Sequence, residues 1–372
     1  MYGRTLENNI LSQKKAGKAI VVLGPRQVGK TTLIEKILNG QSYLFLNGDE
    51  PRTRALLSEP STEQIRSIIG QHKIIFIDEA QRIEGIGLTM KIIIDRFKDI
   101  QIYASGSSAF DLSSKISEPL TGRKWEYQLY PISWEEYENH HGFLFTEQDF
   151  ENRLLYGFYP EVLNSPGDEV NVLKNLVNSY LYKDILAFAD IRKPDVLDKL
   201  VQALAFQIGN EVSFNELSKL LNVDKNTVSK YIDILRKGYI IFQLGSYSRN
   251  LRNEIKTNRK IYFYDVGVRN MIIGNFNPLN FRADKGALWE NFLIAERLKQ
   301  NEYKKKLSRI YFWRTSQQQE VDFVEDISGE VFGYEFKWSN KRKHKLPKTF
   351  TETYNARSKI IDRDNFRDFV IL

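Results

Sequence analysis

A glycine-rich stretch near the start of the chain has residue types and spacing suited to binding phosphate. An apolar run, Ala19 to Leu23, leads into Gly24-x-x-x-x-Gly29-Lys30-Thr31, and an amphipathic segment follows. Glycines let the backbone curl so that successive N–H groups face phosphate oxygens, and the N-terminus of a following helix adds its dipole. The stretch therefore predicts a strand, a phosphate-binding loop and a helix, in that order. A glycine-containing turn without a ligand is the alternative interpretation.

The spacing of this stretch is that of a P-loop. Lys30 is expected to reach the β and γ phosphates of ATP, and the Thr31 hydroxyl to bind Mg²⁺. ATP and Mg²⁺ are accordingly the predicted cofactors. The residues predicted to contact the nucleotide are Gly24, Pro25, Arg26, Gln27, Val28, Gly29, Lys30, Thr31 and Thr32.

A second apolar run, KIIFIDEAQ, ends in two carboxylates, as parallel strands do where their C-terminal ends form a ligand crevice. Asp78 is predicted to hold the Mg²⁺ shell. Glu79 is predicted to orient or deprotonate the attacking water, because nucleotide hydrolysis depends mostly on positioning and charge stabilisation. A strand that is simply capped by acids before a helix is the alternative.

A third apolar run, IQIYASGSS, brings serines to the end of another strand. Ser105, Ser107 and Ser108 are expected to reach the γ-phosphate or the attacking water. Turn residues that cap the next helix would show the same pattern.

Four segments together resemble the AAA+ superfamily: GPRQVGKTT, IIFIDEAQ, ASGSS and LTGRKWEYQLYPISWEEY. Within it, the chain looks like the prokaryotic ATPases fused to a C-terminal domain of unknown function, and the resemblance spans nearly all of it. The resemblance implies that Ser105 is a first sensor of the γ-phosphate. It also implies that Arg123, from the same or a neighbouring subunit, stabilises transition-state charge. Arg26 competes for that role, and an exposed arginine of structural use only is the alternative for Arg123.

Length and composition limit the remaining function classes. The 372 residues allow two or three domains with their own cores. The lack of cysteine excludes disulfides and thiol nucleophiles, and the histidines have no metal-binding spacing. A reducing, cytoplasmic setting is predicted, since no apolar run approaches roughly 20 residues and no secretory signal is recognisable. The four histidines are His72, His140, His141 and His344.

The net charge of +7 is distributed unevenly. Residues 201–260 and 333–372 each carry twice as many lysines and arginines as acids. Double-stranded DNA is therefore a candidate partner of the C-terminal half. A lysine-rich solvated surface would explain the same excess.

The middle of the chain predicts helices followed by a winged helix-turn-helix. Residues 133–200 have apolar positions at helical spacing and resemble the helical lid after an AAA+ core. In SFNELSKLLNVDKNTVSKYIDILRKG, two short helices flank a turn, with Ser213 as the cap of the first and an apolar strand after the second. The start of the second helix would enter the major groove, although such a module also serves as an interdomain spacer. The predicted DNA contacts are Lys225, Asn226, Thr227, Ser229 and Lys230.

The segment EVDFVEDISGEVFGYEFKW places carboxylates and a lysine at alternate positions on two expected strands. Glu335 and Lys337 are two apart and share one face of a strand. Asp322 lies in the preceding strand, and Glu290 approaches from the upstream helix. Such oxygen ligands beside an amine suit Mg²⁺-assisted phosphodiester cleavage. A solvent-facing hairpin with cross-strand ion pairs is the alternative.

The expected order around this segment is helix, three-stranded meander, helix and strand, which is the core of the restriction-endonuclease-like fold. The residues resemble the PD-(D/E)xK nucleases, with Asp322 and Glu335-Phe336-Lys337 at the motif positions and Glu290 as the helical acid. Val321 stands where the motif often has proline. Glu320 is a further candidate ligand or a surface acid.

The sequence thus predicts an α/β protein with four parts. These are a P-loop AAA+-type ATPase core (1–132), a helical lid (133–200), a winged helix (201–250) and a PD-(D/E)xK nuclease-like domain (251–372). Two functions follow. In one, ATP binding and hydrolysis are coupled to a DNA-associated C-terminal region. In the other, an ATP-dependent switch acts on protein partners and the nuclease-like fold is an inactive scaffold. No membrane partner is expected, and no feature specifies a homo-oligomeric ring.

Overall fold

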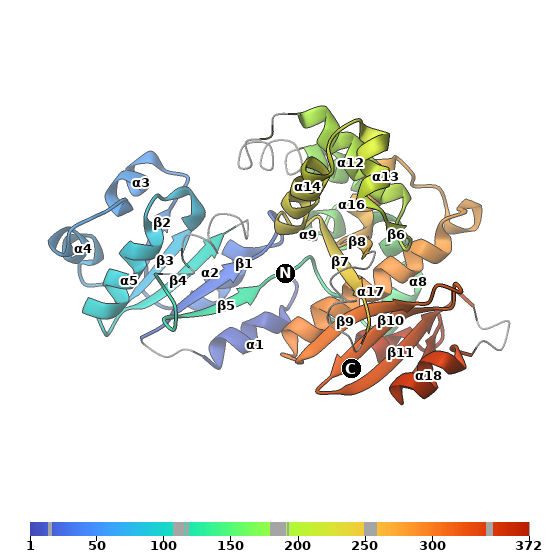
Figure 1. The fold of residues 1–372 in the computed structure, drawn as a ribbon. Helices are drawn as coiled ribbons and strands as arrows, with labels where there is room; N and C mark the ends of the chain where they lie inside the picture. Colours follow the sequence, from blue (N-terminus) through green and yellow to red (C-terminus); the bar gives the residue numbers. More distant parts are fainter. Residues whose placement is uncertain are drawn as a thin grey trace. The chain divides into compact units, whose positions relative to one another are not determined.

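The computed structural model describes residues 1–13, 17–106, 116, 119–178, 191, 193–248, 259–339 and 345–371. Ser107, Ser108, His344 and residues 179–190 lie outside these described residues. The chain forms two compact units, here called unit 1 and unit 2 (Figure 1). Unit 1 comprises Met1–Ile132 with Lys237–Tyr239, and unit 2 comprises Ser133–Arg236 with Ile240–Leu372.

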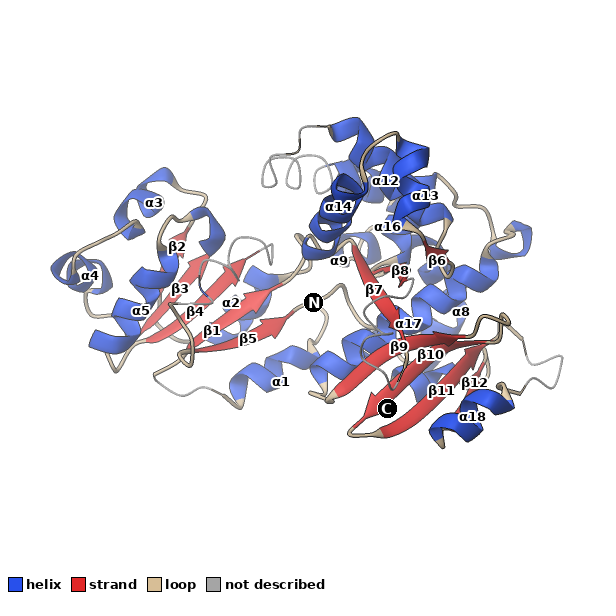
Figure 2. Ribbon diagram, in the orientation of Figure 1, coloured by secondary structure: helices blue, strands red, loops and turns tan. Residues whose placement is uncertain are grey.

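Unit 1 is built on a five-stranded sheet with the order β2-β3-β4-β1-β5, in which every pair of neighbours is parallel (Figure 2). Its central strands are apolar and buried because helices cover parallel sheets on both faces. The strands are β1 (Ala19–Leu23), β2 (Leu44–Asn47), β3 (Ile74–Asp78), β4 (Gln101–Gly106) and β5 (Lys124–Gln128).

Helices α2 and α5 of unit 1 pack against β4 of this sheet, and α1 packs against α2. In α2 the buried residues include Leu33, Ile34 and Ile37, at the spacing that puts side chains on one side of a helix. The helices are α1 (Thr5–Leu11), α2 (Lys30–Leu38), α3 (Pro51–Leu57), α4 (Thr62–Ile69), the 3₁₀ turn η1 (Ala80–Arg82) and α5 (Ile86–Arg96).

The strand register brings three chain segments to one edge of this sheet. Leu23 of β1 is paired with Gly106 of β4, and Ile77 of β3 is paired with Ala104 of β4. The residues that follow β1 and those at the ends of β3 and β4 therefore meet at the carboxyl edge, where open α/β sheets bind ligands.

Unit 2 contains a mixed seven-stranded sheet with the order β12-β11-β10-β9-β7-β8-β6. Strands β9, β10 and β11 form an antiparallel meander, while β12 joins β11 and β7 joins β9 in parallel. The strands are β6 (Glu211–Val212), β7 (Ile241–Ser246), β8 (Arg259–Phe263), β9 (Ser308–Arg314), β10 (Glu320–Ile327), β11 (Glu330–Phe336) and β12 (Arg357–Ile361).

Helices cover both faces of the meander. On one face, Phe350 of α18 packs among Trp313, Val321 and Val324. On the other, Phe369 of α19 contacts Phe323. The helices of unit 2 are α7 (Trp134–His141), α8 (Phe143–Tyr156), α9 (Pro160–Leu163), α10 (Glu169–Val177), α12 (Pro194–Phe206), α13 (Phe214–Leu221), α14 (Lys225–Lys237), α16 (Val266–Ile273), η4 (Leu279–Phe281), α17 (Lys285–Tyr303), α18 (Lys348–Tyr354) and α19 (Phe366–Val370).

The helices predicted as a lid pack within unit 2. Both α8 and α10 contact α16, and α7 contributes Trp134 to an aromatic core. The Trp134 ring meets Phe150 of α8, Phe292 of α17 and Phe366 of α19 at centroid distances of 5.4, 6.0 and 5.4 Å. Residues 133–178 are thus joined to the C-terminal helices by a shared core rather than standing as a separate layer.

The segment predicted as a winged helix has two helices, α13 and α14, flanked by short strands. Ser213 caps α13 by accepting from the Glu216 N–H, and Asn222 adopts a left-handed conformation in the turn between the helices. Strands β6 and β7 both pair with β8 in antiparallel fashion. Within the connection between β7 and β8, residues 249–258 lie outside the described residues.

The long helix α17 is fixed against β8 by one side chain. The Asn291 amide accepts from the Phe263 N–H and donates to the Phe263 carbonyl, both at 2.8 Å. This pair of hydrogen bonds places the preceding residue, Glu290, over β8. Among the described residues, no helix combines the length and the apolar character that crossing a bilayer requires.

Candidate active site

The loop between β1 and α2 has the backbone of a phosphate cradle. Gly29 adopts φ +90° directly before α2, a conformation that glycine takes without strain. Gly24 runs against the chain after β5: a Cβ added there would lie 2.0 Å from the Leu129 carbonyl oxygen. The loop can follow this path only with glycines at these positions.

Lys30 lies inside the loop that precedes it. Its ammonium is buried and donates to the carbonyls of Gly24 and Pro25, at 3.1 and 2.7 Å. Of the other predicted nucleotide contacts, Pro25 and Val28 are buried, Arg26 and Thr31 are half-buried, and Gln27 and Thr32 are exposed. Each of these residues belongs to the loop or to the first turn of α2, so the loop brings the predicted set together.

Thr31 and Ser105 both donate to the carboxylate of Asp78. The Thr31 hydroxyl lies 3.1 and 2.9 Å from its two oxygens, and Ser105 donates to Oδ1. Asp78 and Ser105 are buried at the ends of β3 and β4. A carboxylate beside a hydroxyl at the mouth of the loop is the oxygen donor set that Mg²⁺ prefers, so these residues fit the ion of a magnesium nucleotide.

Glu79 is held in an unusual backbone conformation beside this group. Its φ of +47° is uncommon for a residue with a side chain. Its N–H donates to the Ser105 hydroxyl at 3.3 Å, and its carboxylate accepts from Gln81 Nε2 at 2.5 Å. Gly48 allows this turn, since a Cβ there would lie 2.4 Å from the Glu79 carbonyl oxygen. The predicted water-activating residue therefore lies next to the predicted metal residue, with a defined orientation.

Arg123 is not part of this group in its own unit. Its carbonyl accepts from the N–H of Ala19, the first residue of β1, whereas the phosphate loop follows the last residue of that strand. The first and last residues of this strand are about 13 Å apart, since strand residues advance about 3.3 Å each. The Arg123 guanidinium pairs with Asp95 at 2.8 Å and is 37% exposed. Arg123 could therefore play its predicted role, stabilising transition-state charge, only in the site of a neighbouring subunit.

In unit 2, Asp322 and Glu335 share one face of the β10–β11 hairpin. Phe323 is paired with Tyr334, so the next pair along the antiparallel register is Asp322 with Glu335. The Asp322 carboxylate accepts from the Phe336 N–H at 2.8 Å. Lys337 donates to Glu335 at 2.6 Å. The predicted alternation of side chains is therefore present at the edge of the meander.

Glu290 takes different partners, both from β8. Its Oε1 accepts from the Tyr262 hydroxyl at 2.6 Å and lies 3.3 Å from Lys260 Nζ. Lys260 also pairs with Glu320, the first residue of β10. Lys260 and Tyr262 are two apart, so both side chains leave the same face of β8.

Glu290, Glu320, Asp322 and Glu335 are here called the acidic cluster. The pKa values of its groups follow from burial and from neighbouring charges. Burial raises the pKa of Asp322 well above its ordinary value, and the carboxylates of Glu290 and Glu335 raise it further. Burial alone would lower the pKa of Lys260, but Glu290 and Glu320 raise it above the ordinary value. Lys260 is therefore a charged ammonium at neutral pH.

The structure does not assemble the predicted nuclease metal site. Within the described part of the chain, no three acids or histidines come together in a way that could hold a metal ion. The predicted ligands Glu290, Asp322 and Glu335 are instead directed to Lys260, to the Phe336 N–H and to Lys337. These residues do not fit a divalent cation as they stand.

The predicted DNA contacts lie at the start of α14. Lys225, Asn226, Ser229 and Lys230 are exposed there. Thr227 differs from them, because its hydroxyl donates to Asp224, whose carboxylate also accepts the Thr227 N–H at 2.9 Å. The first two turns therefore present two lysines and two small polar side chains, while Asp224, the residue before α14, caps the helix by accepting the Thr227 N–H.

Three residues beside these sites were missed in the sequence. Gln81 was contained in the DEAQ segment, and its spacing of two from Glu79 is the signal that pointed to it. Lys260 and Tyr262 alternate in an apolar strand, and a lysine in such a strand needs a buried partner. That partner, Glu290, lies on a separate element of the chain.

Comparisons with known proteins divide the chain in three. Residues 16–138 match the model of an AAA domain. Residues 147–279 and 285–370 match two domains of unknown function, DUF8612 and DUF4143.

Relatives cover most of the chain. An uncharacterized protein of Mycobacterium tuberculosis is 26% identical over 328 residues, 86% of this chain and 70% of that protein. An uncharacterized protein of Haemophilus influenzae is 24% identical over 384 residues, 94% of this chain and 88% of that protein.

Solved structures show weaker likeness. The Walker-type ATPase PABY2304 of Pyrococcus abyssi has a TM-score of 0.48 and 18% identity, covering 73% of this chain and 96% of its own. The RuvB Holliday junction branch migration motor of Thermotoga maritima has a TM-score of 0.35 and 17% identity, covering 70% of this chain and 92% of its own. The AAA match over residues 16–138 and the phosphate cradle described above both support a P-loop ATPase domain of the AAA type in this part of the chain.

Proposed function

We propose that this protein binds MgATP in unit 1, hydrolyses it, and uses the nucleotide cycle to control a DNA-associated unit 2. The observation that carries the proposal is the convergence of Thr31, Asp78 and Ser105 at the mouth of the phosphate loop, with Glu79 beside them. This is the set that phosphoryl transfer to water requires: an ion site, a sensor of the γ-phosphate and a group that orients the water.

Each residue of unit 1 has a distinct part in the proposed reaction. The loop N–H groups and Lys30 bind the phosphates, for which Lys30 exchanges its present carbonyl partners. Thr31 and Asp78 would hold Mg²⁺, which neutralises phosphate charge when it is bound. Glu79 accepts the proton of the attacking water, and its bond from Gln81 fixes the carboxylate meanwhile.

Binding and turnover of ATP in two variants test this proposal. Lys30→Ala removes the phosphate cation and is expected to weaken binding of a nonhydrolysable MgATP analogue in calorimetry. Glu79→Gln keeps the size and hydrogen bonding of the side chain but cannot accept the proton, so binding persists while turnover falls by about 100-fold or more. Wild-type turnover in Glu79→Gln would remove Glu79 from the mechanism, and no heat of binding to the folded wild type would end the proposal.

DNA association is the second part of the proposal. Elements α13 and α14 with strands β6, β7 and β8 have the order of a winged helix, and the first two turns of α14 carry exposed Lys225 and Lys230. In such modules the start of this helix enters the major groove. Phosphate contacts by lysines supply affinity that falls as salt rises.

A switch that acts on protein partners is the second candidate function. It is favoured by one observation, the ammonium of Lys260 among the acids of the nuclease-like region. In this version, unit 2 keeps the order of elements of a restriction-endonuclease-like domain as a binding scaffold and does not cut. DNA-independent ATP turnover, together with no duplex binding at low salt, would favour this candidate over the first.

A further inference from the structure

The acidic cluster of unit 2 is built around a buried lysine. The Lys260 side chain is 1% exposed, and its ammonium lies 3.3 Å from Glu290 and pairs with Glu320. The ammonium also lies over the ring of Phe312, with 5.5 Å between Nζ and the ring centroid. An ammonium leaves water at a large cost, and opposite charges with an aromatic face offset that cost.

Lys260 reaches the cluster from another part of unit 2. It lies on β8, whereas Glu290 lies on α17 and Glu320 on β10. The Asn291–Phe263 hydrogen bonds hold α17 on β8, so the ammonium and Glu290 are kept together by the backbone as well as by charge. The lysine is therefore a fixed component of the cluster rather than a surface side chain that turns inward.

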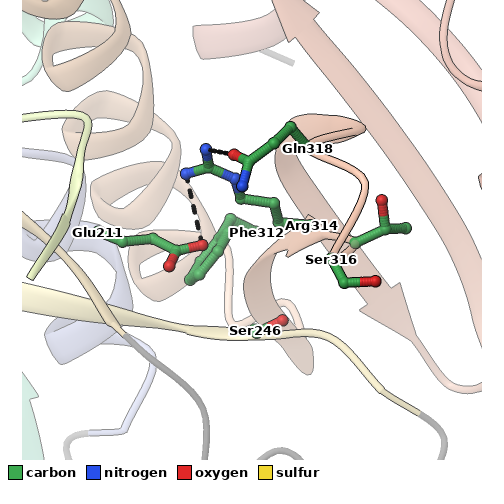
Figure 3. A pocket seen from close by; sticks show the side chains of 7 residues that line it. Glu211, Ser246, Phe312, Arg314, Ser316 and Gln318 are labelled. Atoms are coloured by element: carbon green, nitrogen blue, oxygen red, sulfur yellow. Dashed lines mark hydrogen bonds and ion pairs between the residues drawn. The ribbon is translucent and has the colours of Figure 1, made fainter.

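The second oxygen of Glu320 has a cationic partner too. Glu320 pairs through its second oxygen with Arg314, at 3.6 Å, and Arg314 also pairs with Glu211 at 3.6 Å. Figure 3 shows Arg314 between Glu211 and Gln318 at a cavity of about 300 Å³, whose wall includes the Phe312 ring. Each acid of the cluster already faces a cation or an N–H donor.

A divalent cation competes with this arrangement. Mg²⁺ and Mn²⁺ need several oxygen ligands at close range, whereas Glu290 and Glu320 are both paired with the Lys260 ammonium. An ion bound by Glu290 and Asp322 would lie close to the Lys260 ammonium, and like charges repel strongly in a buried site. The fixed lysine therefore opposes the binding of a metal ion by these two acids.

We infer that Lys260 is the permanent cation of this cluster and occupies the place that a divalent metal ion takes in nucleases of the PD-(D/E)xK type. The inference rests on the nuclease-like assignment in the proposed function and is independent of ATP hydrolysis in unit 1. As a consequence, unit 2 does not cleave DNA by a metal-dependent route. The cluster instead ties β8, α17 and β10 into one structure.

Titration of Mn²⁺ followed by electron paramagnetic resonance tests the inference on the full chain without nucleotide. All proteins carry Asp78→Asn, which removes the predicted ion site of unit 1. In the parent protein, we expect no Mn²⁺ site that depends on Asp322. Any Mn²⁺ binding at this cluster should have a dissociation constant above about 10 mM. Lys260→Ala is expected to gain one site at least about tenfold tighter, in the range of weak oxygen-ligand sites, and a further Asp322→Asn change removes it.

The controls separate the role of Lys260 from a general loss of charge. Lys299→Ala removes another buried lysine of unit 2, one that pairs with Glu296 at 2.6 Å, and is expected to gain no Asp322-dependent site. Lys260→Met, which keeps most of the volume, replaces Lys260→Ala if circular dichroism shows that the alanine variant is unfolded.

Two results would overturn the inference. One is an Mn²⁺ site in the parent that disappears with Asp322→Asn, which the parent alone can reveal. The other is a folded Lys260 variant that gains no site. Neither result changes the measurement of ATP binding in unit 1, so failure of the inference and failure of the ATPase proposal are distinguishable.

Discussion

The Thr31 hydroxyl donates to both oxygens of the Asp78 carboxylate, joining the first turn of α2 to the end of β3. This contact brings the two predicted Mg²⁺ residues together before any ion is bound. Asp78→Asn removes the charge but keeps the shape. It is expected to weaken binding of a nonhydrolysable ATP analogue by about 10- to 100-fold with Mg²⁺ and to change binding little in EDTA.

Calorimetry with and without Mg²⁺ measures that difference. Asp99→Asn is the matched control, because Asp99 is an acid of the same unit that is 81% exposed and pairs only loosely with Lys73, at 3.3 Å. Equal loss of affinity in EDTA and in Mg²⁺ would show that Asp78 supports the loop itself and not the ion.

Gly24→Ala is expected to damage unit 1 through one contact. The added Cβ would lie 2.0 Å from the Leu129 carbonyl oxygen, and neither backbone can move without opening the loop. We expect a loss of about 1–3 kcal/mol in the free energy of unfolding, with weaker ATP binding. Urea titration and calorimetry measure the two effects. Gly3→Ala, where nothing lies within 4 Å of the added atom, should be silent in both. A stable Gly24→Ala protein with normal affinity would contradict the close approach.

Acid is expected to weaken unit 2 at the start of α17. Burial alone would raise the pKa of Asp284, but hydrogen bonds from Arg282 and Arg269 lower it from 3.8 to about 2. A lowered folded-state pKa stabilises the fold above the unfolded value and loses that contribution as pH falls through the folded value. About 2 kcal/mol should therefore disappear between about pH 4 and pH 2.

The comparison with Asp284→Asn isolates this contribution. The variant should be less stable than the wild type at neutral pH and should approach it in stability near pH 2. Asp368→Asn serves as the control, since Asp368 is 61% exposed. Parallel stability curves for wild type and Asp284→Asn from pH 7 to pH 2 would show that Asp284 does not titrate with the fold.

The phosphate site could be predicted from the sequence because its parts are local. The loop glycines, Lys30 and Thr31 are contiguous, and Asp78 and Glu79 end one apolar strand. Parallel strands then bring these ends to the same edge whatever their separation in the chain. Arg123 is different, since it precedes a strand, and a residue before a parallel strand lies at the opposite edge from the loop. The family motif that Arg123 resembles does not indicate at which edge of the sheet the residue lies.

The acidic cluster could be predicted only in part, because some of its residues come from elements that are far apart in the sequence. Asp322 and Glu335 face one another because a short hairpin fixes their register, and the hairpin is visible in the sequence. Lys260 enters from β8, which joins the meander through β7, and no local pattern predicts that pairing. The metal site was therefore predicted from the acids and Lys337, without the second lysine, Lys260, that pairs with Glu290 and Glu320.

A buried ion pair joins α17 to β10, and removing only one of its partners should strongly destabilise unit 2. Arg297 donates to both oxygens of Glu325, at 3.0 and 2.7 Å, and Glu325 is fully buried on β10. Glu325→Gln leaves the guanidinium without its countercharge and is expected to reduce the free energy of unfolding by about 3–5 kcal/mol. Asp233→Asn breaks the exposed pair with Arg236, at 2.6 Å, and should cost less than about 1 kcal/mol. Urea unfolding followed by tryptophan fluorescence measures both, and similar costs in the two variants would contradict the difference in burial.

Duplex binding by α14 is expected to depend on salt through the two exposed lysines in its first two turns. Each lysine that neutralises a DNA phosphate contributes about 0.9 to the slope of log affinity against log salt. Changing Lys225 and Lys230 together to alanine should therefore lower the slope by roughly 2 and weaken binding similarly for unrelated duplex sequences. Fluorescence anisotropy over a series of salt concentrations gives the slope. The control changes Lys73 and Lys98, two exposed lysines of unit 1, so that the net charge falls equally. If both double variants reduce the slope to the same extent, α14 is not the binding element, because only total charge would then matter.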